Sequence, residues 1–248
     1  MKPVVVITGV QRGIGKATAE QFSKNGWHVI GIGKREKTKI PEINHFIHAD
    51  ISEESGWEKI HREILGQEGH IDVLVNNAAI QICKPVLETT IEEWDKTMAT
   101  NLRSVFLSVR SLVPLFGKNG GAIINISSVH ALATSKNISA YAASKGAVDA
   151  FTRALSLELA PLKIRVNAVL PGAIDTDMLR AGLAHRHVGG NSTEDELFTL
   201  GEKHALGRIG KPEEIARIIY FLASEEASFI SGQRIVADGG AMARLSNE

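Results

Sequence analysis

The chain has 248 residues, 44% of them hydrophobic and 23% charged, which suits one large α/β domain or two small ones. It carries 28 basic and 28 acidic side chains, and the resulting zero net charge argues against a nucleic-acid or anionic-membrane surface. Cys83 is the only cysteine, so we expect no disulfide within the chain and no cysteine-based zinc site. With no signal peptide and no apolar run of membrane-spanning length, a reducing, cytoplasmic compartment is favoured.

Short apolar runs rich in β-branched residues alternate with longer helical patterns. Strands are predicted at Val4–Ile7, Val29–Ile32, His45–His48, Ile71–Val75, Ala122–Ile126, Ile164–Val169 and Arg234–Ala237. Helices are predicted at Gly13–Asn25, Glu53–Gly66, Ile91–Phe116, Ala140–Leu159 and Pro212–Ala223. This alternation predicts an α/β fold: a three-layer, doubly wound parallel sheet of Rossmann type with right-handed crossovers. No linker divides the chain, so we expect a single domain over residues 1–248.

Two segments break the alternation. Lys34–Asn44 is charged and contains Pro41, so the helix normally found between the second and third strands is expected to be short or absent. Asp175–Gly207 is long and polar and contains three glycines, which predicts a long loop. Loops of that length in compact domains are usually functional or mobile.

A glycine-rich segment follows the first strand and opens the first helix. Glycines there permit a tight turn, and they let backbone N–H groups and the helix N-terminus approach a pyrophosphate. Glycines also mark plain turns, but the strand before and the helix after favour a phosphate loop. The residues predicted to form it are Gly9, Gln11, Arg12, Gly13, Ile14 and Gly15.

The spacing of this loop, Thr-Gly-x-x-x-Gly-x-Gly, resembles the short-chain dehydrogenase/reductase family, and the resemblance extends over nearly the whole chain. It implies that Asp50 bonds the adenine of NAD(P), with Ile51 beside it; the alternative is that Asp50 caps the helix starting near Ser52. It also implies that the turn Asn76-Asn77-Ala78-Ala79 supports the central sheet and passes beside the cofactor. Ala79 stands where the family has glycine, so a positive φ there would be strained.

Tyr141 and Lys145 are four residues apart on a predicted helix and share one face. A phenol can supply the proton that an alkoxide needs after hydride transfer, and a nearby ammonium favours the phenolate and lowers the phenol's pKa. Alone, the pair also fits a helix with one buried aromatic and one exposed cation. The resemblance adds Ser128 as the group that bonds the substrate oxygen, with Ser127 as its structural neighbour. It adds Asn101 as a helix-bending residue that binds a water linking Lys145 to solvent; the alternative is an exposed helical Asn.

The resemblance also assigns cofactor contacts after the sixth strand. Pro171, Gly172 and Ile174 are implied to hold the nicotinamide amide, and Thr176 to bond the amide or the pyrophosphate. Tyr141 also lines the cofactor site, and Lys145 is implied to bind the nicotinamide ribose. A plain strand-to-loop turn would explain the Pro-Gly pair but not the threonine at that offset.

The second strand ends in Gly33-Lys34-Arg35, where NAD-selective members carry an acid that binds the ribose 2′-hydroxyl. Two cations could bind a 2′-phosphate, and Arg12 adds a third, so NADP(H) is favoured. NAD(H) stays possible if Lys34 and Arg35 are ordinary solvated charges and Glu36 serves the ribose.

The sequence thus predicts an NAD(P)-dependent oxidoreductase that moves a hydride between nicotinamide and a carbonyl or secondary alcohol. Its small-molecule substrate, whose identity stays open, would lie under a lid at about residues 175–207, next to Ile80, Ile82 and Leu132. The histidines of the lid, His185, His187 and His204, are expected to be solvated, and no metal site is expected.

The resemblance implies a homotetramer that pairs Ile91–Phe116 and Ala140–Leu159 across subunits and packs the last strand at a second interface. One alternative is a non-catalytic dinucleotide-binding sensor or scaffold on the same fold. The presence of both Tyr141 and Lys145 speaks against it. Another is a nucleotide-sugar epimerase or dehydratase, which resembles longer chains with a different glycine spacing.

Overall fold

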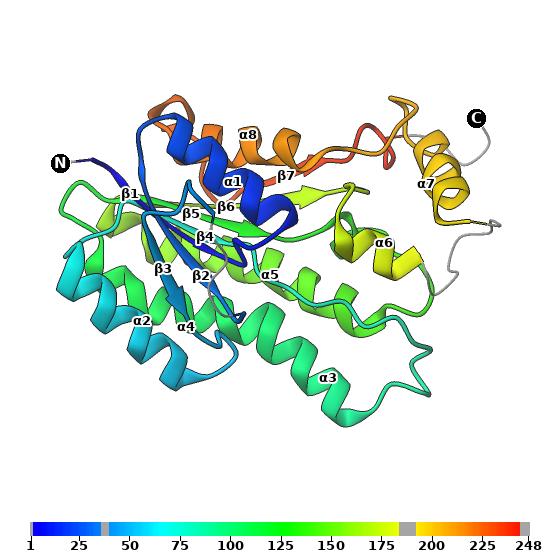
Figure 1. Ribbon diagram of the computed structural model, residues 1–248, viewed down its shortest axis with the longest axis horizontal. Coiled ribbons are helices and arrows are strands. Elements are labelled where there is room, and N and C mark those ends of the chain that lie inside the picture. Colours follow the sequence, from blue (N-terminus) through cyan, green and yellow to red (C-terminus); the bar gives the residue numbers. More distant parts are fainter. Residues whose placement is uncertain (1, 36–39, 184–191, 244–248) are drawn as a thin grey trace.

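The computed structural model describes residues 2–35, 40–183 and 192–243, which build one parallel sheet of seven strands in the order β3-β2-β1-β4-β5-β6-β7 (Figure 1). The strands are β1 (Val4–Thr8), β2 (His28–Gly33), β3 (His45–His48), β4 (Val73–Asn76), β5 (Gly121–Ile126), β6 (Ile164–Pro171) and β7 (Arg234–Ala237). The predicted strand positions and the doubly wound α/β class are confirmed. The order of the strands reverses between β1 and β4, where a doubly wound sheet opens a crevice at its carboxyl edge.

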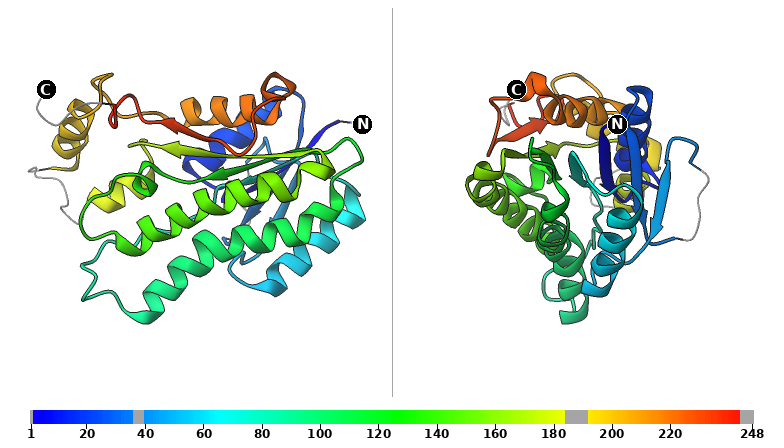
Figure 2. Two further views of the ribbon diagram at one scale, coloured as in Figure 1. Left: turned by 180° about the vertical axis from the view of Figure 1, so that it is seen from behind. Right: turned by 90° about the vertical axis from the view of Figure 1, so that its left-hand side faces the viewer.

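Helices cover both faces of the sheet (Figure 2). One face carries α1 (Gly13–Lys24) and α8 (Pro212–Ala223), and the other carries α2 (Glu54–Gln67), α4 (Ser104–Leu112) and α5 (Ser139–Glu158). The helix α3 (Ile91–Met98) leads into α4, while α6 (Asp177–Leu183) and α7 (Thr193–Glu202) lie beyond the end of the sheet. The three-layer arrangement follows from strands that are apolar on both faces and must be covered twice.

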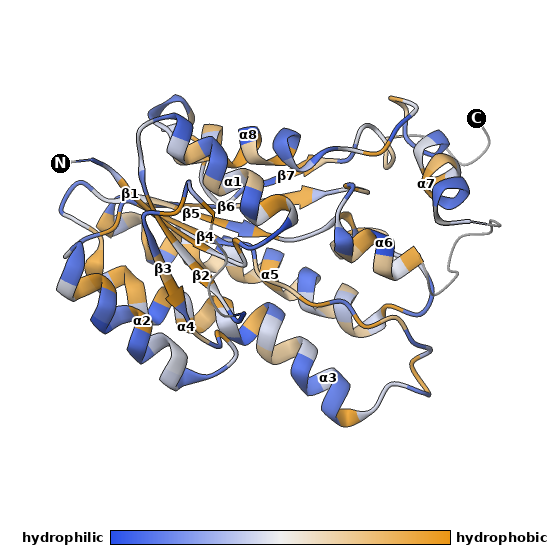
Figure 3. Cartoon of the chain, in the orientation of Figure 1, coloured by the Kyte–Doolittle hydropathy of each residue, from blue (hydrophilic) through white to orange (hydrophobic). Residues whose placement is uncertain are grey.

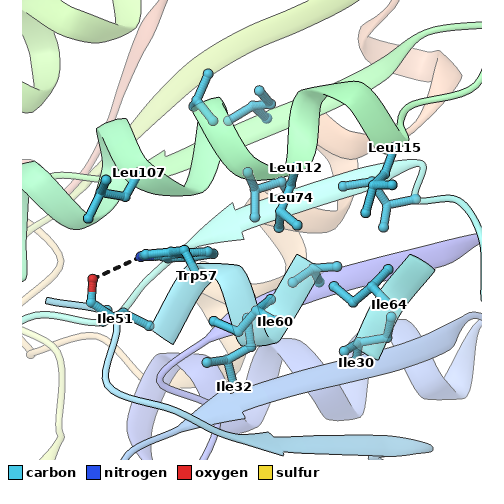
Figure 4. Close-up of a cluster of buried hydrophobic side chains, with 14 of the residues drawn as sticks. Ile30, Ile32, Ile51, Trp57, Ile60, Ile64, Leu74, Leu107, Leu112 and Leu115 are labelled. Atoms are coloured by element: carbon cyan, nitrogen blue, oxygen red, sulfur yellow. Dashed lines mark hydrogen bonds between the residues drawn. The ribbon is translucent and has the colours of Figure 1, made fainter. Parts of the chain in front are cut away.

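The two hydrophobic cores lie between the sheet and its helix layers, and apolar residues concentrate on the central strands (Figure 3). In the core under α2 and α4, the Trp57 ring is buried against leucine and isoleucine side chains, and its Nε1 donates to the Ile51 carbonyl oxygen at 2.9 Å (Figure 4). Each fully buried large aliphatic side chain stabilises the fold by about 1.5–3 kcal/mol. These cores hold the strand ends, and therefore the site, in fixed positions.

The predicted helix Ile91–Phe116 is not uniform. Between α3 and α4 the chain forms a π-helical segment, Ala99–Arg103, and after α4 it ends in a 3₁₀ turn, Val113–Leu115, that contains Pro114. Asn101 in the π segment turns its side chain to the Ile80 backbone, which a regular helix would not accommodate.

The expectation of a long loop at Asp175–Gly207 was wrong, because α6 and α7 lie within it. Ser192 caps α7 by accepting from the Asp195 backbone N–H at 3.2 Å, and the first turn is acidic, as the helix dipole favours. His204 is 4% exposed, with its Nδ1 2.7 Å from the Leu200 carbonyl oxygen, so it is not a solvated loop histidine. His185 and His187 lie outside the described residues.

The segment Lys34–Asn44 contains no helix within its described residues, 34–35 and 40–44, as expected. Glu36, the alternative ligand for an NAD ribose, lies outside the described part of the chain.

Candidate active site

The predicted site residues gather at the carboxyl edge of the sheet. The glycine loop follows β1, the Asn77 turn follows β4, Ser128 follows β5 and the Pro171–Thr176 segment ends β6. Because β1 and β4 are neighbours and α1 starts at this edge, these segments surround the crevice at the strand-order reversal.

The glycine loop is shaped to approach an anion. Gly9 and Gly13 have φ of 71° and 53°, and a Cβ on Gly15 would lie 2.2 Å from the Gly9 carbonyl oxygen. The N-cap of α1, Arg12, makes no side-chain capping bond, and the first turn contains no acidic residue. The N-terminus of α1 is therefore chemically suited to the pyrophosphate of a dinucleotide.

The turn after β4 is fixed to this loop. The Thr8 hydroxyl oxygen accepts from the backbone N–H groups of Asn77 and Ala78, both at 3.0 Å. The Asn77 Nδ2 donates to the carbonyl oxygens of Thr8 at 2.9 Å and Gly9 at 3.2 Å. Ala79 is not among the residues with positive φ, so the strain considered for it does not arise.

At the outer rim, Lys34 Nζ lies 2.5 Å from an Asp50 carboxylate oxygen, and the other oxygen accepts from the Ser52 N–H at 3.0 Å. Partial burial would raise the pKa of Asp50, but the hydrogen bonds from Lys34 and Ser52 outweigh it and lower that pKa. Glu53 occupies the N-cap of α2, so Asp50 is not its cap.

Gln11 connects the glycine loop to the same rim. Its side-chain amide donates to the Arg35 carbonyl oxygen at 3.1 Å and accepts from the Arg35 N–H at 3.3 Å. Arg12, expected beside Lys34 and Arg35, instead pairs with Asp177 of α6 at 3.5 Å. Arg12 therefore has a carboxylate partner, and its predicted part in binding a 2′-phosphate stays a prediction.

Tyr141 and Lys145 lie on the inward face of α5, and both are buried. The Lys145 Nζ is 5.6 Å from the centre of the Tyr141 ring and donates to the Ile126 carbonyl oxygen at 2.7 Å. Burial raises the pKa of Tyr141 to about 12, against a hydrogen bond with Ser128 that lowers it. Burial lowers the pKa of Lys145 to about 8, against the Asp149 carboxylate that raises it.

Two sequence-based interpretations are corrected here. Lys145 is not an exposed cation, since it is 2% exposed. The pKa of Tyr141 does not lie near neutrality in the structure, because the cost of burying the phenolate exceeds the stabilising effects of its neighbours.

Ser128 is 6% exposed and lies close enough to Tyr141 to lower its pKa, which brings the predicted serine and tyrosine together. Its hydroxyl oxygen also accepts from the His130 backbone N–H at 3.2 Å. The His130 ring stands edge-on to Tyr141, with ring centres 6.0 Å apart, and burial lowers the pKa of His130. The neighbouring Ser127 hydroxyl donates to the Lys145 carbonyl oxygen at 3.0 Å.

Asn101 is 1% exposed, so it is not a surface residue. Its Oδ1 accepts from the Ile80 N–H, and its Nδ2 donates to the Ile80 carbonyl oxygen, both at 2.9 Å. The Nδ2 also donates to the Ser144 hydroxyl at 3.1 Å. Asn101 thus ties the segment after β4 to α5, close to the Tyr141 pair.

Comparison with known proteins places this geometry in a family. Residues 9–242 match a family model described as enoyl-(acyl carrier protein) reductase. The cyclopentanol dehydrogenase of Comamonas sp. (strain NCIMB 9872) is 37% identical over 247 residues, covering 96% of each chain. A solved short chain dehydrogenase family protein of Francisella tularensis subsp. tularensis SCHU S4 is 30% identical with a TM-score of 0.90, covering 98% of this chain and 100% of that one.

The chain belongs to the short-chain dehydrogenase/reductase family. A solved member, the ligand-free aldohexose dehydrogenase of Thermoplasma acidophilum, has a TM-score of 0.91 at 35% identity and covers 99% of this chain and 96% of that one. As a member of this family, the chain is an NAD(P)-dependent oxidoreductase that interconverts alcohols and carbonyls by hydride transfer.

In this family member, a buried network of polar side chains supports the site; the sequence reasoning placed Asn76 in the turn that ends β4 but missed its partners Asn125 and Thr152. Asn76 Nδ2 donates to Asn125 Oδ1 at 2.9 Å, and Asn125 Nδ2 donates to the Thr152 hydroxyl at 2.9 Å. The sequence signal for this network was an asparagine in each of the apolar strands β4 and β5, because a buried amide needs hydrogen-bond partners. These hydrogen bonds join the central strands β4 and β5 to α5, the helix that carries Lys145.

The segment after β6 closes the other side of the dehydrogenase site. The Gly172 N–H donates to the Ala237 carbonyl oxygen at 3.0 Å, and a Cβ on Gly172 would lie 2.8 Å from the Asp238 Cα. Ile174 is buried, and the Thr176 methyl would lie 3.1 Å from a Cβ on Gly13. Thr176 therefore lies against the glycine loop, as its predicted cofactor contact requires.

A hollow of about 360 Å³ lies between the segment after β4 and α6. It is lined by Arg12, Ala79, Ile80, Gln81, Ile82, Cys83, Lys84, Asp177, Met178, Ala181 and Gly182. Ile80 and Ile82 line it as expected, whereas Leu132 is outside its lining and is 37% exposed.

Within the described ranges, no three or more His, Cys, Asp or Glu side chains are grouped so that they could hold a metal ion. No helix in the part of the chain that the structure describes is long and apolar enough to cross a membrane.

Proposed function

We propose that Tyr141 is the general acid when the substrate carbonyl is reduced and the general base when the alcohol is oxidised. The observation that supports it is the cluster of Tyr141, Ser128 and Lys145, buried together at the carboxyl edge of the sheet beside the glycine loop. A phenol with a raised pKa stays protonated at neutral pH and is ready to donate. Ser128 would polarise the substrate oxygen through its hydroxyl.

When bound, the nicotinamide cofactor donates or accepts the hydride. Lys145 would bind the ribose hydroxyls by releasing the Ile126 carbonyl oxygen, and its charge would favour the Tyr141 phenolate as the proton leaves. Asn101 would position this pair through Ile80 and Ser144 and would hold the water through which the proton exchanges with solvent.

A matched pair of serine variants tests these roles. Ser128→Ala should lower kcat by about 10²–10³, the usual effect of removing one donor to the reacting oxygen, while NADPH binding persists. Ser127→Ala, which removes a hydroxyl that donates to the Lys145 backbone carbonyl oxygen and faces Asp149, should cost less activity. Equal losses in the two variants would contradict the assignment of Ser128.

We further propose that NADP(H) is preferred over NAD(H). Lys34 and Arg35 follow β2 at the rim and supply two positive charges for a 2′-phosphate. The carboxylate of Asp50 lies at the same rim, where it is paired with Lys34. Fluorescence titration of the purified protein with NADPH and NADH at matched salt tests this preference. Tighter NADPH binding is expected, and tighter NADH binding would overturn it.

We propose that the whole chain is one NAD(P)-binding domain in which α6 and α7 form a lid over the substrate. The hollow between the lid and the segment after β4 is lined by Ile80 and Ile82 and also by the paired Arg12 and Asp177. A lining of this mixed apolar and polar kind suits a compact secondary alcohol or ketone. Cyclopentanol, the alcohol named for the Comamonas relative, is of this kind. A panel of cyclic alcohols, diols and sugars, followed by nicotinamide absorbance, tests the substrate class.

We propose a homotetramer in the cytoplasm. Apolar side chains are exposed in two areas: Trp94 and Phe106 on α3 and α4, and Phe221, Phe229 and Val236 around α8 and β7. Such side chains suit burial between subunits. Sedimentation equilibrium should give four times the chain mass of 26.8 kDa, and a monomer would contradict the proposal.

A further inference from the structure

Asp149 lies one helical turn after Lys145 on the inward face of α5. It is 4% exposed, and neither carboxylate oxygen has a hydrogen-bond partner of ordinary geometry within the described residues. A buried carboxylate without such partners destabilises the fold, so its position needs an explanation beyond packing.

The charges that face Asp149 come from two elements. Lys145 and Arg153 lie on α5, and Arg234 lies on β7; the Ser127 hydroxyl, at the end of β5, also faces it. Burial raises the pKa of Asp149, and these four neighbours act in the opposite direction. Both arginines are exposed at the surface, whereas Lys145 is buried like Asp149 itself.

Lys145 likewise is a buried charge that lacks a charged hydrogen-bond partner among the described residues. Its ammonium group is buried, and it donates a hydrogen bond to a neutral acceptor, the Ile126 carbonyl oxygen. Asp149 is the one ionisable residue of the described chain whose charge raises the pKa of Lys145. No ion pair joins Lys145 and Asp149, both of which the structure describes, and Ser127, Arg234 and Arg153 each lower the pKa of Asp149 more than Lys145 does. The attraction between the two buried charges acts over a longer distance, where the surroundings screen it weakly.

We propose that Asp149 is a positioning residue that keeps Lys145 protonated beside Tyr141. The proposal rests on the proposed role of Lys145 in catalysis and adds the group that maintains its charge. Asp149 touches neither substrate nor cofactor; it acts through the lysine. An isosteric neutral side chain at this position should therefore leave the fold intact and make Lys145 lose its proton at lower pH.

The test is a pH titration of Lys145 in the full-length, cofactor-free protein, followed by NMR of a ¹³C-labelled lysine side chain and assigned with Lys145→Arg. Asp149→Asn should move the midpoint to lower pH, the direction expected when a nearby opposite charge is removed. Glu158→Gln, which removes an exposed carboxylate at the far end of α5, should leave it in place. Asp149→Ser provides a second neutral variant if the Asn variant does not fold, and the same shift is expected.

An unmoved Lys145 midpoint in a folded neutral variant would overturn the proposal. Loss of stability with an unmoved midpoint would likewise overturn it and would make Asp149 a structural anchor for Arg234 of β7.

The pH profile of turnover separates this proposal from the proposed function. If Lys145 supports catalysis, the alkaline limb of the profile should move to lower pH together with the midpoint in Asp149→Asn. A shifted midpoint with an unmoved profile would support the role of Asp149 and would contradict the role given to Lys145.

Discussion

The buried pair on α5 and the exposed rim after β2 both place a cation near a carboxylate, but in different surroundings. Lys145 and Asp149 are 2% and 4% exposed, whereas the side chains of Lys34 and Asp50 are 75% and 34% exposed. Burial is the largest cause of the pKa shifts of Lys145 and Asp149, whereas at the rim the hydrogen bonds from Lys34 and Ser52 outweigh partial burial and lower the pKa of Asp50. Water and salt screen the charges at the rim more than those in the interior. Under the proposed function, the interior pair would act on the chemistry and the rim on cofactor preference.

The glycine loop should be the least tolerant part of the site. Gly15→Ala places a Cβ 2.2 Å from the Gly9 carbonyl oxygen, so the loop must move, and NADPH binding should fall below detection. Gly66→Ala is the matched control, because its Cβ would meet nothing within 4 Å on α2; it should stabilise the protein by about 0.4–1 kcal/mol. Titration and thermal unfolding measure both variants, and normal NADPH binding by Gly15→Ala would contradict the loop's role.

Asn101→Ala should have the next largest effect. It leaves the buried Ile80 N–H and carbonyl without their partner, at about 1–3 kcal/mol for each unsatisfied group, and it frees the π-helical segment to straighten. Denaturant unfolding should show that loss, and turnover should fall with it. Asn119→Ala, an exposed Asn, provides the control and should change neither. A stable Asn101→Ala protein would show that the π segment does not depend on this side chain.

At the rim, removing one cation should have a smaller and salt-dependent effect. Lys34→Ala or Arg35→Ala should weaken NADPH binding by roughly ten- to 150-fold, because a charge-assisted bond to phosphate contributes about 1.5–3 kcal/mol. NADH affinity should stay nearly constant, and the difference should shrink as salt is added. Parallel loss of both affinities would place these cations outside the 2′-phosphate site.

The smallest effect is expected for the Arg12–Asp177 pair, whose side chains are 54% and 68% exposed. Arg12→Ala should change the free energy of unfolding by no more than about 0.2–1 kcal/mol. If substrate KM rises while stability is constant, the pair contributes to the lid; if neither changes, it is an ordinary surface contact.

The sequence predicted the sheet, its helices and the grouping of Ser128, Tyr141 and Lys145, because strong periodicity and spacing carry that information. It did not predict α6 and α7, because three glycines and a polar composition obscured two short capped helices. It also missed the direction of Tyr141's pKa, since the depth of burial is set by contacts distant in sequence. The sequence did not predict the Arg12–Asp177 pair for the same reason: Asp177 lies 165 residues further along the chain.

The central claim is that the Tyr141 phenol carries the proton in turnover. The chain has two tyrosines, so Tyr141→Phe and Tyr220→Phe form a matched pair that each lose one hydroxyl. We predict that Tyr141→Phe lowers kcat by at least about 10²–10⁴ while NADPH still binds, and that Tyr220→Phe, whose ring packs on Phe22, is unchanged. Near-normal turnover by Tyr141→Phe would contradict the account.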